Sequence, residues 1–156
     1  MINTNLTSVF LLTRHAGKHM LARDSGKVIV IASVLTFQGG ILVPSYTAAK
    51  VGVGQLTKAF AHEWVSKGGN LNAIASGYMS RDHTAPQYGQ TRSVPVKSWN
   101  GFPLDVGAAP GDLSGAIVFL ASRASDYGTG MGWLSTRLVE PLIPKTITMA
   151  SILIPR

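Results

Sequence analysis

The sequence predicts an α/β fold built on a doubly wound parallel sheet. Two runs rich in apolar residues, at 27–33 and 70–75, indicate buried strands, and the continuous hydrophobicity of the first is typical of a strand that is covered on both faces. Each run follows a segment with the periodicity of an amphipathic helix, and this alternation is typical of right-handed crossovers. The composition agrees, because 17 of the 156 residues are glycine and only 13% are charged, against a usual ~25%.

Residues 4–22 are expected to form the first helix, and Asp24-Ser-Gly26 punctuates the chain before the strand at 27–33. The apolar stripe of this helix comprises Leu6, Val9, Phe10, Thr13, Ala16, Gly17, Met20 and Leu21. Gly39-Gly40 and Pro44 mark a loop, and residues 45–67 read as a long second helix that ends at Gly68-Gly69. Its predicted buried stripe comprises Ala49, Val53, Leu56, Phe60 and Trp64.

The remainder of the chain is less regular. Residues 77–110 have little periodicity and are expected to form a long loop or lid, and such loops are often functional. A further helix is expected to open at Pro110-Gly-Asp112. The face of that helix comprises Leu113, Ala116, Ile117 and Leu120. After Gly130 the pattern ends, so we divide the chain into 1–133 and an atypical tail at 134–156.

Charge and cysteine content exclude several classes of protein. Fourteen Lys and Arg residues against seven Asp and Glu give a formal charge of +7, which raises the question of nucleic-acid binding. The basic residues are scattered and form no run, so we expect no nucleic-acid partner. The absence of cysteine excludes disulfides and thiolate metal sites. With no long apolar run and no basic segment before the apolar start, we expect a soluble, cytoplasmic protein without a membrane partner.

Tyr46 and Lys50 are four residues apart at the start of the second predicted helix, which places both side chains on one face. A lysine ammonium beside a phenol stabilises the phenolate, and such a tyrosine can exchange a proton with a substrate hydroxyl or carbonyl. Taken alone, this spacing is usually that of an ordinary surface pair. Here Ser33 closes the preceding strand and Ser76-Gly77 follow the next one. Carboxyl ends of parallel strands face the ligand crevice, so these positions are expected to share one sheet edge.

These residues together resemble the short-chain dehydrogenase/reductase family. The matching segments are Asn5-Leu6, Val28–Ser33, Tyr46-Thr-Ala-Ala-Lys50 and Asn72–Gly77. Residues 37–64, FQGGILVPSYTAAKVGVGQLTKAFAHEW, are similar to gluconate-type members that act on keto-deoxygluconates. Residues 111–130 resemble the family's late helix and the turn after it, and the resemblance covers roughly residues 2–133.

The resemblance implies hydride transfer between NAD or NADP and a carbonyl or secondary alcohol, with a sugar acid as the candidate small-molecule substrate. By this resemblance Tyr46 would be the general acid/base and Ser33 would hydrogen-bond the substrate oxygen. Lys50 would bind the nicotinamide ribose and stabilise the phenolate of Tyr46. Asn5 would hold a water in a proton relay from Lys50 to solvent. Backbone groups around Ser76-Gly77 would face the nicotinamide.

The resemblance also implies a Rossmann-like sheet of which this chain carries the C-terminal, catalytic half. The N-terminal dinucleotide-binding half, with its Gly-rich phosphate turn, is expected to be lacking, because no such turn follows a strand at the start of the chain. Most of the family's last strand is also expected to be missing after Gly130. Two interpretations stay open: an NAD(P)-dependent oxidoreductase, and a truncated, inactive relative that acts only through subunit association.

Two long helices pack against a partner subunit in the family, so the resemblance implies a homo-oligomer through helices 4–22 and 45–67.

His15 and His19 are also four apart, a spacing that occurs in metal sites. The sequence offers them no evident third ligand, although His62, Asp82 and His83 are candidates in principle. We therefore expect a solvated helix face and no metal.

Overall fold

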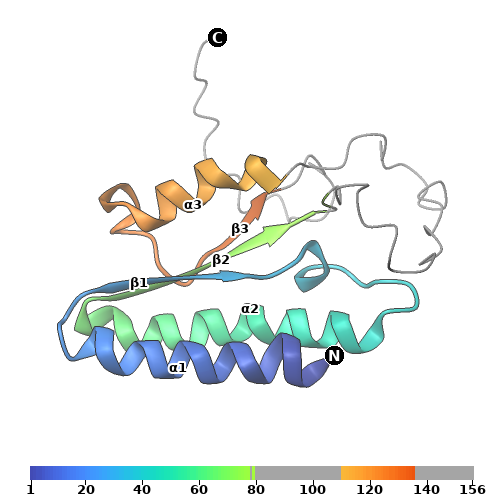
Figure 1. Ribbon diagram of the computed structural model, residues 1–156, viewed down its shortest axis with the longest axis horizontal. Helices are drawn as coiled ribbons and strands as arrows, with labels where there is room; N and C mark the ends of the chain where they lie inside the picture. The colour runs from blue at the N-terminus through green and yellow to red at the C-terminus, as the bar shows by residue number, and fades with distance from the viewer. Residues whose placement is uncertain (78, 80–109, 136–156) are drawn as a thin grey trace, which may run out of the picture.

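The computed structural model of the chain describes residues 1–77, 79 and 110–135, and the statements below concern these residues. Three parallel strands form one sheet in the order β1-β2-β3. Helices α1 and α2 lie on one face of the sheet and α3 lies on the other (Figure 1). In chain order the elements are η1 (Asn3–Thr7), α1 (Ser8–Leu21), β1 (Gly26–Ile31), η2 (Val34–Thr36), α2 (Pro44–Trp64), η3 (Val65–Lys67), β2 (Gly69–Ser76), η5 (Pro110–Leu113), α3 (Ser114–Ala121), η6 (Arg123–Ser125) and β3 (Gly132–Ser135). The predicted α/β fold with a parallel sheet is confirmed.

The strand register brings the carboxyl ends of β1 and β2 to the same edge. Gly26 pairs with Gly69 at one end and Ile31 pairs with Ile74 at the other. Strand β1 ends two residues before the expected boundary, because Ser33 leaves the strand to cap η2. The backbone pairing still reaches Ala32, whose N–H donates to the Ile74 carbonyl at 2.8 Å.

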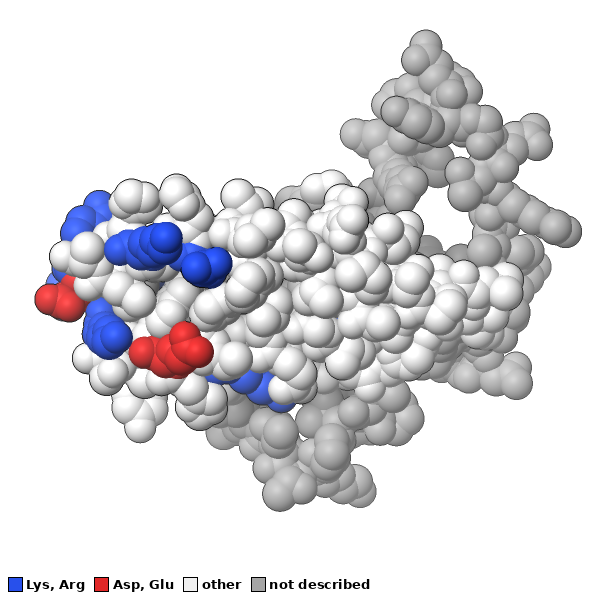
Figure 2. Space-filling model, turned by 90° about the horizontal axis from the view of Figure 1, so that it is seen from below, with Lys and Arg blue, Asp and Glu red and all other residues white. Residues whose placement is uncertain are grey.

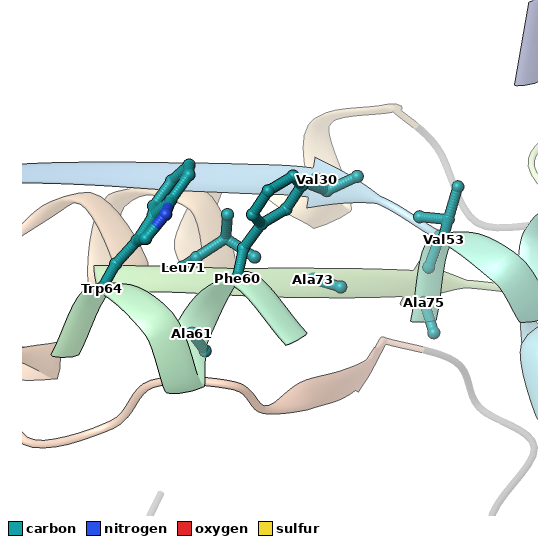
Figure 3. Packing of buried hydrophobic residues seen from close by; sticks show 9 residues of the cluster. Val30, Val53, Phe60, Ala61, Trp64, Leu71, Ala73 and Ala75 are labelled. Carbon is teal, nitrogen blue, oxygen red and sulfur yellow. The ribbon is translucent and has the colours of Figure 1, made fainter. Parts of the chain in front are cut away.

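The core lies between α2 and the sheet, as the apolar stripe predicts. Phe60 and Trp64 point from α2 toward Val30 and Leu71 of the strands (Figure 3). Their ring centroids are 4.9 Å apart, a distance typical of aromatic pairs. A side chain on Gly17 of α1 would collide with the Trp64 ring, so this glycine allows the two helices to approach closely. Burying these rings on strand side chains holds α2 at a fixed height above the sheet.

Coverage on both faces, expected for both strands, holds for β2 only. In β2 every residue from Gly69 to Ala75 is buried, whereas in β1 only Val30 is buried and Ile31 is 46% exposed. The reason is position: β2 is the middle strand, and no described strand pairs with the outer edge of β1.

A short strand, β3, forms at the end of the described residues, where the sequence shows no clear pattern, and it spans the boundary proposed between residues 133 and 134. It forms because the backbone at 130–131 already pairs with β2: Gly130 N–H donates to the Leu71 carbonyl at 2.7 Å, and Ala73 N–H to the Met131 carbonyl at 2.9 Å. The predicted face of α3 is only partly buried. Leu120 is buried, but Ile117 is 40% exposed because α3 packs on the edge strand β1.

Two asparagines in β2 hold the turn that precedes β3. Asn70 and Asn72 each donate from Nδ2 to the Gly128 carbonyl at 2.8 Å. Asn72 Oδ1 accepts from the Met131 N–H at 3.1 Å, and Asn72 is only 1% exposed. Asn70 and Asn72 occupy alternate positions of β2, and their side chains provide hydrogen-bond partners for backbone groups of the turn.

Lys27 of β1 reaches the same turn. Its Nζ donates to Ser125 Oγ at 2.9 Å and lies 2.8 Å from Asp126 Oδ1. Because the Asp126 side chain is 56% exposed, water screens the ion pair and its contribution to stability is small. The buried amide network, rather than the ion pair, fixes the turn.

None of the helices within these described ranges is long and apolar enough to cross a membrane.

Replacing Asn72 with alanine is expected to lower the free energy of unfolding by about 2–4 kcal/mol, because the mutation removes three hydrogen bonds of a buried side chain. Asn72 Nδ2 donates to Asn70 Oδ1 and to the Gly128 carbonyl, and Asn72 Oδ1 accepts from the Met131 N–H. Urea unfolding measures the loss. Asn3→Ala, at an exposed position, is the matched control and should leave stability nearly unchanged. Equal stability of the two variants would show that the asparagine network does not hold the turn.

Candidate active site

The candidate site lies where β1 ends and α2 begins. Pro44 occupies the first turn of α2, where its missing N–H costs no hydrogen bond, so Tyr46 and Lys50 fall in the first two turns. Their spacing brings them together: Lys50 Nζ lies 5.6 Å from the centroid of the Tyr46 ring. No described residue makes a hydrogen bond with the Tyr46 hydroxyl, which leaves this group available.

Lys50 is a buried cation, with 8% of its surface exposed. Its Nζ donates to the carbonyl of Ile31 at 2.8 Å, so the side chain ties α2 to the carboxyl end of β1. Burial lowers the pKa of the Lys50 ammonium, because desolvation disfavours the charged form. An ammonium has three donors, and within the described residues only one has a partner. Two hydrogens remain for further polar groups.

Ser33 caps the short helix η2 directly after β1. Its Oγ accepts from the Leu35 N–H at 3.2 Å, and the Thr36 hydroxyl in turn accepts from the Ser33 N–H at 3.3 Å. This reciprocal arrangement is a capping box. Ser33 is 7% exposed. No hydrogen bond within the described residues joins Ser33 directly to Tyr46, and the hydrogen-bonded link to α2 runs through Thr36.

Asn5 and Lys50 line one groove of about 480 Å³ between α1 and β1. Asn5 lies in η1, a π-helical turn, and its Nδ2 donates to the Met1 carbonyl at 3.1 Å. Four consecutive strand residues, Val28–Ile31, form one wall of the groove. The groove therefore joins two of the predicted site residues, from α2 and from the turn before α1.

Ser76 and Gly77 lie at the end of β2, two and three residues beyond the Ile31–Ile74 pair. Both are half-buried. Among the described residues, no hydrogen bond joins them to Tyr46 or Lys50. The structure thus sets Lys50 beside the Tyr46 ring and on the same groove as Asn5, and it sets Ser33 and Ser76-Gly77 on neighbouring strand ends. The predicted lid at 77–110 lies, apart from Gly77, Met79 and Pro110, outside the described residues.

Sequence reasoning missed Thr36, although the S-x-x-T spacing after Ser33 is a capping-box signal. It also missed two buried polar atoms without a partner in the described part of the chain, Gln38 Nε2 and Thr47 Oγ1. Both lie in the segment that joins Ser33 to Lys50.

The His15 and His19 rings meet edge to face with centroids 5.2 Å apart. The described ranges contain no group of three or more His, Cys, Asp or Glu residues that could hold a metal ion.

Comparison with known proteins identifies the family. A model of the family described as short chain dehydrogenase matches residues 1–91. The chain belongs to the short-chain dehydrogenase family. The resemblance to gluconate-type members is confirmed as well: 2-dehydro-3-deoxy-D-gluconate 5-dehydrogenase of Bacillus subtilis (strain 168) is 48% identical over 148 residues, which covers 86% of this chain and 55% of the relative. The enzyme of the same name from Escherichia coli (strain K12) is 45% identical over 143 residues, covering 86% of this chain and 56% of that enzyme.

Solved structures agree with this assignment. A protein of Agrobacterium tumefaciens, provisionally named a 2-deoxy-D-gluconate 3-dehydrogenase and solved with bound NADP, superposes with a TM-score of 0.71 at 42% identity, over 85% of this chain and 54% of that one. A protein of Beutenbergia cavernae, provisionally named an NAD(P)-dependent gluconate 5-dehydrogenase, gives 0.73 at 38% identity, over 86% and 53%. The chain spans about half the length of the curated relatives that it matches.

Lys50 should make stability depend on pH. Its pKa is lower in the folded chain than the ordinary 10.5, so between these two values the unfolded chain holds a proton that the folded chain has lost. The free energy of unfolding then rises with pH across this window, as the cost of burying the charge disappears. Lys50→Met keeps the length of the side chain and removes the titration. The native chain should therefore gain stability relative to Lys50→Met as the pH increases from neutral toward 10.5.

Urea unfolding at a series of pH values measures this difference. Lys58→Met, at an exposed position on the same helix, is the control and should show no such change. A constant difference between the native chain and Lys50→Met at all pH values would contradict the prediction.

Proposed function

We propose that this chain supplies the catalytic residues of an NAD(P)-dependent dehydrogenase that interconverts a carbonyl and a secondary alcohol of a sugar acid. The observation that carries the proposal is the Tyr46–Lys50 pair at the end of β1, with Lys50 fixed on the Ile31 carbonyl. Family membership supports the reaction type, and the names of the relatives support a keto-deoxygluconate as substrate.

Each side chain has a distinct task in this proposal. Tyr46 donates a proton to the substrate carbonyl during reduction and removes one from the hydroxyl during oxidation. The buried cation of Lys50 stabilises the phenolate, because Coulomb attraction is stronger away from water. Ser33 Oγ already accepts a hydrogen bond from Leu35, so its own hydrogen can be donated to the substrate oxygen. Asn5, in the same groove as Lys50, holds a water through which Lys50 recovers its proton.

The residues present fit the nicotinamide and ribose end of the cofactor. The ammonium of Lys50 is buried with two hydrogens that have no partner in the described chain, and ribose hydroxyls would satisfy them. Lys50 and Tyr46 would hold the ribose, and the backbone of Ser76-Gly77 would hold the nicotinamide. NAD or NADP supplies or accepts the hydride when bound. We assign no described residue to the phosphates of the cofactor.

For the location of the protein we propose the cytoplasm, because a chain without cysteine is compatible with this reducing compartment.

Tyr46→Phe tests the reaction. It removes the proton donor and keeps the ring, so the rate of nicotinamide-dependent oxidation or reduction of 2-dehydro-3-deoxy-D-gluconate should fall at least ~100-fold. Affinity for the cofactor, measured by calorimetry or by nicotinamide fluorescence, should stay within about threefold. Tyr127→Phe, at a fully exposed position, is the matched control and should keep the native rate. An active Tyr46→Phe chain would refute the assignment.

A second candidate function is association without catalysis, which the match to only about half of each relative favours. The same titration separates the two. Micromolar cofactor binding by the 156-residue chain would exclude an inactive relative. If the chain neither binds the cofactor nor turns over the substrate, association without catalysis would be favoured.

We also propose that the chain forms a homo-oligomer through α1 and α2. Figure 2 shows that the outer face of these helices is largely without charge, with Lys, Arg, Asp and Glu gathered at one end. Leu11, Leu12 and Val51 are 53%, 71% and 40% exposed. A shallow groove of about 460 Å³ runs between the helices, with Phe10, Leu56 and Ala59 among its lining. An exposed apolar area of this kind is typical of interaction surfaces, and a second copy presents the same uncharged face.

Ala59→Arg should shift the chain toward monomer. It puts a cation in the groove between α1 and α2 at an exposed position, where folding tolerates a long side chain. Sedimentation equilibrium gives the dissociation constant, which we expect to rise at least ~100-fold because an unpaired charge at an apolar interface is costly. The control Ala124→Arg lies on η6, which is in contact with α3. Equal association of the two variants, or a monomeric native chain, would exclude this interface.

A further inference from the structure

A single hydroxyl joins the turn of Ser33 to the helix of Tyr46 and Lys50. Thr36 Oγ1 accepts a hydrogen bond from the Ser33 N–H at 3.3 Å and donates one to the Lys50 carbonyl at 3.0 Å. The two partners are 17 residues apart in the sequence and belong to different elements. No other hydrogen bond among the described residues connects η2, or the serine that caps it, with α2.

The methyl group of Thr36 is fixed as tightly as its hydroxyl. A Cβ on Gly54 would lie 2.5 Å from Thr36 Cγ2, so this methyl occupies the space that a side chain at position 54 would fill. Gly54 lies one helical turn beyond Lys50, and the two contacts therefore hold Thr36 against one face of α2. A β-branched side chain with both branches engaged has one allowed rotamer, so its hydroxyl cannot turn away.

The capping box transmits this constraint to the Ser33 hydroxyl. Ser33 Oγ accepts from the Leu35 N–H at 3.2 Å, and the Thr36 hydroxyl closes the box on the Ser33 backbone. With one lone pair used and the side chain 7% exposed, the direction in which the hydroxyl donates is restricted. Loss of the Thr36 hydroxyl would free both Ser33 and the turn that carries it.

We propose that Thr36 is a positioning residue: it sets the Ser33 hydroxyl relative to the Tyr46–Lys50 pair. Its effect on catalysis rests on the function proposed above, whereas its effect on the Ser33 turn does not. A reaction in which one hydroxyl must meet the substrate oxygen while a phenol transfers the proton is sensitive to ångström-scale displacement of either group.

Three variants separate positioning from packing. Thr36→Val removes the hydroxyl and keeps the shape, and Thr36→Ser keeps the hydroxyl and removes the methyl. Thr57→Val is the matched control, because Thr57 is buried in α2 and its hydroxyl donates to the Val53 carbonyl at 2.9 Å, within the same helix and not to the Ser33 turn.

Amide hydrogen exchange of Ser33 and Leu35, followed by NMR, tests the turn directly. In Thr36→Val both amides should exchange at least ~10-fold faster, and in Thr36→Ser and Thr57→Val they should stay within about threefold of the native rates. In the dehydrogenase assay, Thr36→Val should lower kcat about 10–100-fold with an unchanged cofactor Kd, and Thr36→Ser should restore most of it.

The outcomes distinguish the two proposals. Unchanged exchange in Thr36→Val, or equal acceleration in Thr36→Ser, would overturn the positioning role whether or not the chain is active. Accelerated exchange with a native kcat would overturn it as well. If the native chain shows no turnover, the proposed function fails, while accelerated exchange in Thr36→Val alone still supports Thr36 as the residue that fixes the Ser33 turn.

Discussion

The hydrogen bond from Lys50 Nζ to the Ile31 carbonyl is the contact on which the site depends. It places a buried cation at the point where the sheet ends, and it fixes the first two turns of α2 on β1. Burying an ammonium is costly, and the lowered pKa of Lys50 records that cost. The cost is sustained because the aromatic end of the same helix is anchored elsewhere: Phe60 and Trp64 bury their rings against the strands. Apolar packing at one end of α2 thus holds a desolvated charge at the other.

The turn before β3 lies at the other end of the strands, where it contacts Lys27 near the start of β1 and Asn70 near the start of β2. Strand β2 is central and buried, so its backbone position depends on both neighbours. Asn70 and Asn72 satisfy the backbone of the turn, and this lets β3 pair with the second half of β2. The end of β2 carries Ser76, whose backbone, with that of Gly77, is proposed to face the nicotinamide. Hydrogen bonds inside the sheet and a capping box outside it therefore define two adjacent strand ends.

Much of the fold could be predicted from the sequence, because its signals are periodic. The stripe of Ala49, Val53 and Trp64 predicts which face of α2 is buried, and the run at 70–75 predicts a buried strand. What could not be predicted depends on contacts between distant segments. Strand β3 forms through backbone pairing with β2. In the sequence Asn72 is only a polar residue within a strand, and its hydrogen bond to the Met131 N–H cannot be inferred from that pattern. The pairing of Tyr46 with Lys50 follows from helical spacing, but the bridge through Thr36 requires η2 and α2 to be placed in space.

The distribution of charge links composition to chemistry. On the face formed by α1 and α2, the charges of the described residues, of both signs, gather at one end (Figure 2). The first six residues of α1 carry no charged side chain, since Arg14 and Lys18 follow later in the helix, and in the first half of α2 the only charged side chain is the buried Lys50. Low polarity around a single buried cation strengthens its field, since the Coulomb energy varies inversely with the local dielectric constant. The scarcity of charge near the helix starts therefore leaves Lys50 as the one charged side chain in the first half of α2, beside the ring of Tyr46.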